Sequence, residues 1–104
     1  MNMPVVTPWA GSTVPTQSAL RQLLAEEGLS PYSWSNGPFD VYSGHSHSYN
    51  KVIYVVQGSI TFGLPELGKQ LTLNAGDRLD LPAGVVHDAH VGARGVICLE
   101  AHKD

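Results

Sequence analysis

From Tyr32 onward the chain consists of short runs rich in Val, Ile, Tyr and Leu, separated every few residues by Gly, Pro or Asn. Such runs are typical of β-strands, and the residues between them are those that tight turns favour. We expect strands over residues 39–43, 51–57, 59–64, 69–73, 77–81, 85–91 and 95–101. Gly58-Ser59 stands between two of these runs and predicts a tight hairpin turn. Since no strand alternates with a second helix, βαβ units are excluded, and the many short strands predict a sandwich or a barrel.

The only convincing helix precedes these strands. Three leucines recur at i, i+3 and i+4 and form one apolar stripe, made of Leu20, Leu23 and Leu24. Thr16 is a good N-cap residue, and Gly28 is typical of the position just after a helix C-terminus. The pattern predicts a helix near residues 17–27 that packs on the β-domain.

Residues 1–15 contain three prolines and predict an extended arm. Its apolar residues, Val5, Val6 and Trp9, need a surface that covers them, and a partner subunit is one candidate. We therefore expect a homodimer. The chain is expected to be one domain overall, with residues 1–30 as an arm and helix packed on a barrel formed by residues 31–104.

Composition limits the classes of function. The chain has 104 residues, of which 42% are hydrophobic and 14% charged, and this suits one compact domain. A net charge of −3 provides no basic surface for nucleic acid or anionic lipid, and no apolar run is long enough to span a bilayer. The single cysteine, Cys98, excludes an intramolecular disulfide framework, and the N-terminus lacks the pattern of a secretory signal. We expect a cytoplasmic protein without nucleic-acid or membrane partners.

The histidines are the residues that carry chemistry. His45 and His47 are two residues apart, so on a strand their side chains project to the same face. Two imidazoles on one face can be adjacent ligands of one metal ion. Pairs of this kind also arise easily on a surface, so the residues around the pair decide how it is interpreted.

Those surrounding residues form two spaced groups. Gly44-His45-Ser46-His47 is followed by Lys51 and Gly58, and later come Gly76, Pro82-Ala83-Gly84 and His87. Over residues 40–91 the chain resembles the paired motifs of the cupin superfamily, namely H-x-H, Glu and Gly, then Gly, P-x-G and His. The resemblance implies an all-β, cupin-type jelly-roll β-barrel, often dimeric. It further implies that His45, His47 and His87 surround a bound metal ion.

The chain departs from the family pattern at two positions. Lys51 stands where the family has Glu, and Val91 stands where the family often has a polar residue. A protonated lysine about 5 Å from a dication repels it by roughly 6–7 kcal/mol at an effective dielectric constant of ~20. Either Lys51 points away, or it is neutral, or the metal is weakly bound or absent. A three-histidine site is chemically sound, and spacing does not distinguish Zn, Fe, Ni or Mn.

Three functional hypotheses follow. The first is a metal-dependent enzyme of the oxygenase or isomerase type, in which Lys51 is a candidate catalytic residue that orients a small polar or anionic substrate. The second is a non-catalytic binding module with a metal-free pocket, and the third is an accessory protein with a vestigial pocket. Lys51, Tyr42 and Tyr54 are the candidate ligand-binding residues. No motif for an organic cofactor or a catalytic triad is present.

Overall fold

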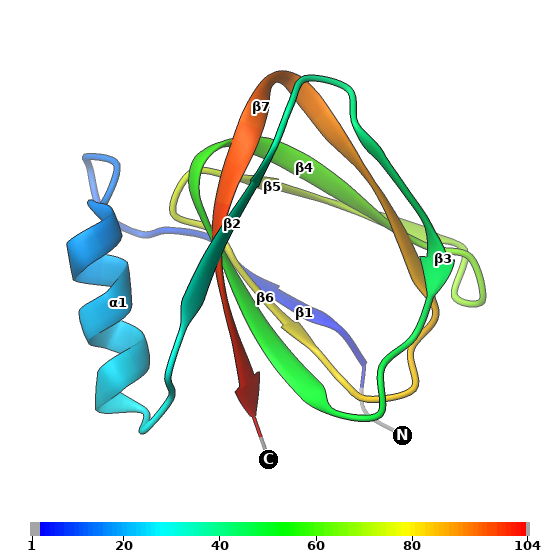
Figure 1. The fold of residues 1–104 in the computed structure, drawn as a ribbon, viewed down its shortest axis with the longest axis horizontal. Coiled ribbons are helices and arrows are strands. Elements are labelled where there is room, and N and C mark those ends of the chain that lie inside the picture. The colour runs from blue at the N-terminus through cyan, green and yellow to red at the C-terminus, as the bar shows by residue number, and fades with distance from the viewer. Residues whose placement is uncertain (1–2, 104) are drawn as a thin grey trace.

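The computed structural model describes residues 3–103 and contains one helix and seven strands (Figure 1). In chain order these are β1 (Val5–Thr7), α1 (Gln17–Glu26), β2 (Tyr32–Asn36), β3 (Val41–His45), β4 (Asn50–Leu64), β5 (Lys69–Asn74), β6 (Arg78–Leu81) and β7 (His87–Lys103). The strands pair antiparallel in the order β1-β6-β4-β7-β2, with β3 also on β7 and β5 also on β4. The sheet curls around an interior, and the expected all-β fold with one short N-terminal helix is confirmed.

Two long strands, β4 and β7, form the centre of this sheet. The prediction of a hairpin at Gly58-Ser59 is wrong, because β4 continues through this point while it stays paired with β7. The register shifts on both sides of Gly58, whose φ is +82°, and Gly95 on the facing strand has φ +76°. A glycine at positive φ lets a strand bulge and bend. The two glycines therefore bend both strands together where a chain reversal was expected. For the same reason the runs at 85–91 and 95–101 are one strand.

Two strands were not predicted. β2 pairs with β7, with Trp34 opposite Cys98. Its sequence alternates with serines, which are common in loops, and for this reason the segment was not predicted as a strand. The N-terminal arm contains β1, which pairs with β6 of the same chain, and the backbone N–H of Trp9 donates to Asp77 at 3.0 Å. Since the arm lies on its own sheet, it does not by itself require a partner. The homodimer stays a prediction, which light scattering at micromolar concentration would test.

The helix α1 forms where the sequence pattern predicts it, but of the three leucines of the predicted stripe Leu23 is exposed. The Thr16 hydroxyl accepts from the backbone N–H of Ala19 at 3.1 Å, and Gly28 follows the helix at φ +77°. Leu20 and Leu24 are fully buried against one face of the sheet, where they contact a cluster formed by Val52, Tyr54 and Leu99. Within residues 3–103 no helix is both long and apolar enough to cross a membrane.

The opposite face of the sheet forms the main core. Along β4 the side chains of Lys51, Ile53 and Val55 share this inner face, as their common parity predicts. Most of the inner side chains are aliphatic and fully buried, among them Leu73 and Leu79. At one end of the interior the packing gives way to a cavity that contains polar side chains.

Candidate functional site

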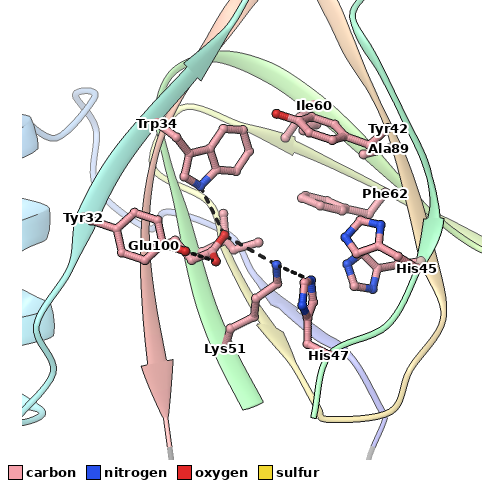
Figure 2. Close-up of a pocket in the computed structure, with 12 residues that line it drawn as sticks. Tyr32, Trp34, Tyr42, His45, His47, Lys51, Ile60, Phe62, Ala89 and Glu100 are labelled. Atoms are coloured by element: carbon pink, nitrogen blue, oxygen red, sulfur yellow. Dashed lines mark hydrogen bonds and ion pairs between the residues drawn. The ribbon is translucent and has the colours of Figure 1, made fainter. Parts of the chain in front are cut away.

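The cavity has a volume of about 230 Å³ and lies inside the curled sheet (Figure 2). One end is polar and is lined by His45, His47, His87, Lys51 and Glu100. The other end is apolar, and its aromatic side chains are Trp34, Tyr42 and Phe62. Figure 2 shows Trp34 and Tyr42 above His45 and His47, with Lys51 and Glu100 across from His45.

The three histidines converge at the polar end. His45 ends β3 and lies opposite His87, the first residue of β7, while His47 follows in the loop between β3 and β4. One ring nitrogen from each residue lies within 4.8 Å of the other two. The ring centroid of His45 lies 4.4 Å from that of His87 and 4.8 Å from that of His47. The predicted grouping is therefore present in the structure.

The hydrogen bonds of two rings fix their tautomers. Nδ1 of His45 lies 2.8 Å from the carbonyl oxygen of Ser43, and Nδ1 of His87 lies 2.9 Å from that of Val85. A carbonyl can only accept, so both Nδ1 atoms carry a proton, and in the neutral form of each ring the lone pair is then on Nε2. A backbone carbonyl that accepts from the other ring nitrogen in this way orients metal-ligating histidines.

His87 supplies the clearest sign of a missing partner. The residue is 2% exposed, and among the described residues its Nε2 is the one buried side-chain polar atom without a hydrogen-bond partner. Leaving a buried polar atom unpaired costs roughly 1–3 kcal/mol. Burial also lowers the pKa of His87, which keeps the ring neutral and its lone pair available. A metal ion satisfies such an atom, so the three histidines fit a divalent cation.

The third ring, His47, is already contacted on both sides. Lys51 Nζ lies 3.3 Å from Nε2 of His47, and the Tyr49 hydroxyl lies 3.3 Å from its Nδ1. Since the ammonium group can only donate, Nε2 accepts and Nδ1 carries the proton. Burial, followed by the positive charge of Lys51, lowers the pKa of His47. The ring is therefore neutral, as metal binding requires.

Lys51 points into the pocket and does not turn away from it. Its side chain is 9% exposed and forms an ion pair with Glu100 at 3.5 Å. The Glu100 carboxylate also accepts hydrogen bonds from the Tyr32 hydroxyl and, at 3.1 Å, from Trp34 Nε1. Glu100 thus holds Lys51 beside His47, as the dashed lines in Figure 2 indicate.

Glu100 is the site residue that the sequence analysis missed. It shares strand parity with Cys98, and it is the one acidic residue in the otherwise apolar run 96–101. An acidic residue on the inner face of such a strand is a usable signal, because carboxylates are seldom buried unpaired. The negative charge of Glu100 compensates the positive charge of Lys51. The pocket with neutral histidines is therefore neutral overall, whereas Glu at position 51 would make it more negative.

The two tyrosines proposed as ligand-binding residues lie on different faces of the sheet. Tyr42 lines the cavity, where its hydroxyl donates to Asn36 and its ring meets Trp34 edge-on at 6.1 Å. Tyr54 lies outside the cavity, packed against α1, with its hydroxyl accepting from Arg78 at 3.3 Å. Placing Tyr54 at the pocket is wrong, because strand alternation turns it away from the face that Lys51 occupies.

Comparisons with known proteins support the fold. No protein-family model and no curated protein matches the sequence. Among solved structures, an RmlC-like cupin from Shewanella frigidimarina is 26% identical, with a TM-score of 0.61 over 71% of this chain and 64% of that chain. A DUF861 family protein from Thermotoga maritima is 16% identical, with a TM-score of 0.64 over 97% of this chain and 100% of that chain.

A cupin superfamily protein from Desulfitobacterium hafniense is 15% identical, with a TM-score of 0.62 over 97% of this chain and 77% of that chain. The order of strands, the placement of both histidine motifs and these three likenesses agree. The described residues therefore have the cupin fold.

Proposed function

We propose that the protein binds one divalent transition-metal ion through His45, His47 and His87 and presents it to a small polar or anionic molecule. The single observation that carries this proposal is the buried, unpartnered Nε2 of His87. It faces two further imidazoles in a cluster whose ring nitrogens lie within 4.8 Å of one another. Three histidines leave coordination positions open, as in catalytic rather than structural sites.

Two other pocket residues, Lys51 and Glu100, would help to bind and orient the small molecule. Lys51 offers a positive donor beside the metal ligands, and Glu100 fixes where that donor lies. The metal ion, when bound, supplies Lewis acidity for an oxygen atom of the bound molecule. An oxygenase or isomerase reaction would use this arrangement, and so would a binding protein without catalysis.

Zinc calorimetry on protein purified without an affinity tag tests the proposal. The parent should bind one Zn²⁺ per chain. Removing a residue that only hydrogen-bonds a metal ligand typically lowers metal affinity by roughly 10–100-fold, and His87→Ala should lower zinc affinity by more than this because it removes a ligand. His90→Ala is the matched control, since His90 is exposed on the same strand. The proposal fails if the parent binds no zinc, or if His87→Ala binds it as tightly as His90→Ala does.

One observation favours a second function, a metal-free binding module. Lys51 already occupies the Nε2 of His47 that a metal ion would take. In this case the protein should be stabilised by small carboxylates after chelator treatment, and Lys51→Met should remove that stabilisation. Thermal melts with acetate and benzoate distinguish this module from a metal site, which chelation would destabilise.

A further inference from the structure

The cavity extends well beyond the three histidines, and its size limits what enters it. Its volume is about 230 Å³. An apolar cavity of about 150 Å³ accommodates benzene. The space therefore suits one six-membered ring with a single substituent. A sugar nucleotide, a peptide or a fused-ring compound would not fit inside it.

The polar end sets the chemistry of that substituent. Lys51 has three N–H bonds, of which one points to His47 and one to Glu100. The third is free for a ligand. Both carboxylate oxygens of Glu100 are already engaged, by the Tyr32 hydroxyl on one and by Trp34 Nε1 and Lys51 on the other, and the negative charge of Glu100 disfavours a second anion beside it unless Lys51 or a metal ion lies between them. A ligand here must accept hydrogen bonds, and an anionic oxygen does so best beside an ammonium group and a metal ion.

The apolar end sets the shape of the remainder. Trp34 is fixed by its bond to Glu100 and Tyr42 by its bond to Asn36, so neither ring needs to be ordered when a ligand binds. Phe62 is 4% exposed and lines the same space, with its ring 6.4 Å from that of His87. Aromatic walls at such spacings favour a planar ring, by about 0.5–1.5 kcal/mol per pair beyond area burial.

We propose that the pocket takes a single-ring planar carboxylate, with the carboxylate at Lys51 and the histidines and the ring between Trp34, Tyr42 and Phe62. This assignment rests on the proposed function only for the metal ion, since Lys51 and the aromatic wall are independent of it. Ala89 lines the ring position opposite Tyr42 on the neighbouring strand. It is 5% exposed, lines the cavity and lies beside Tyr42 in Figure 2.

The test is calorimetry of zinc-loaded protein with four probes, namely benzoate, cyclohexanecarboxylate, benzamide and acetate. Benzoate should bind at least about tenfold more tightly than acetate, which lacks the ring, and than benzamide, which lacks the charge. Ala89→Leu fills the ring position and should abolish the advantage of benzoate over acetate while acetate still binds. Val41→Leu, an exposed position on β3, is the control that should change nothing.

The outcomes separate the two proposals. Failure to load zinc overturns the proposed metal site, and the same probes on chelated protein then test Lys51 and the aromatic wall alone. Normal zinc loading with equal affinity for benzoate and acetate overturns the ring assignment and leaves the metal site standing. Equal affinity for benzoate and cyclohexanecarboxylate overturns the preference for a planar ring. If Ala89→Leu does not fold, Phe62→Leu replaces it and should reduce the preference for benzoate over cyclohexanecarboxylate.

Discussion

The ammonium group of Lys51 lies 3.3 Å from Nε2 of His47, the atom that would coordinate a metal ion bound by the three histidines. Proton donor and metal ion therefore compete for one lone pair. Glu100, 3.5 Å from the same ammonium group, can hold Lys51 when a metal ion takes its place at His47. The affinity of the site for cations is set by this pair of opposite charges, and two substitutions test that in opposite directions.

Lys51→Met should strengthen Zn²⁺ binding. The substitution removes a positive charge next to the ion and leaves Glu100 as a net negative charge in a poorly solvated pocket. We expect a gain of about tenfold or more, since one unit charge near a dication is worth several kcal/mol even at an effective dielectric constant of ~20. Lys69→Met makes the same charge change at an exposed position and should have no effect. Equal zinc affinity of the two variants by calorimetry would show that Lys51 does not influence the site.

Glu100→Gln should weaken Zn²⁺ binding by about tenfold or more, because it leaves Lys51 as an uncompensated positive charge. The amide oxygen can still accept from Trp34, so the packing of the aromatic wall is kept. Near-ultraviolet circular dichroism should therefore match that of the parent while calorimetry reports the loss. An unchanged zinc affinity with an intact aromatic signal would contradict the role given to Glu100.

The sequence alone predicted the histidine cluster, but it did not predict the positions of Tyr54 and Glu100 correctly. The cluster of His45, His47 and His87 was predicted from the resemblance of the two spaced motifs to those of the cupin superfamily, and strand parity alone does not place His47, because it lies in the loop after β3. The same parity rule, applied to β4, places Tyr54 opposite Lys51, and applied to β7 it places Glu100 inside. Alternation along the strand was not applied to either residue, so Tyr54 was wrongly assigned to the pocket and Glu100 was missed.

The long strands could not be predicted, since a glycine at positive φ serves a hairpin and a bulge equally well. The choice at Gly58 is made by the partner strand, whose Gly95 bends at the same place. Such pairing is a long-range property, and a local reading of residues 57–59 does not contain it. β2 was missed for a related reason, because its pairing with β7 stabilises a segment in which polar residues alternate.

Gly58→Ala should be more destabilising than Gly68→Ala. Both glycines have positive φ, +82° and +64°, and this costs an alanine about 1–2 kcal/mol. A Cβ on Gly58 would also collide with the carbonyl oxygen of Gly95, whereas a Cβ on Gly68 would meet nothing within 4 Å. Urea denaturation should show a clearly larger loss of unfolding free energy for Gly58→Ala. Equal losses would mean that β4 and β7 do not bend together at this point.

The ion pair between Arg78 and Glu27 gives a pH-dependent contribution to stability. Its hydrogen bond lowers the pKa of Glu27 from 4.5, so the contribution is fully present above about pH 4.5 and is lost as the pH falls through the lowered value. The Glu27 side chain is 35% exposed, and solvent screening limits the effect to about 0.2–1 kcal/mol. Glu27→Gln should melt a few degrees below the parent at pH 7, and the gap should close in strong acid. A gap that persists unchanged at pH 2 would exclude this ion pair as its cause.

The most direct test of the metal site is anomalous diffraction at the zinc edge from crystals grown with Zn²⁺. The site described here predicts one strong peak per chain, about 2.0–2.1 Å from one ring nitrogen each of His45, His47 and His87. It also predicts that Lys51 Nζ has left His47 and remains with Glu100. A map without a peak at the three histidines, with Lys51 still in contact with Nε2 of His47, would contradict the account.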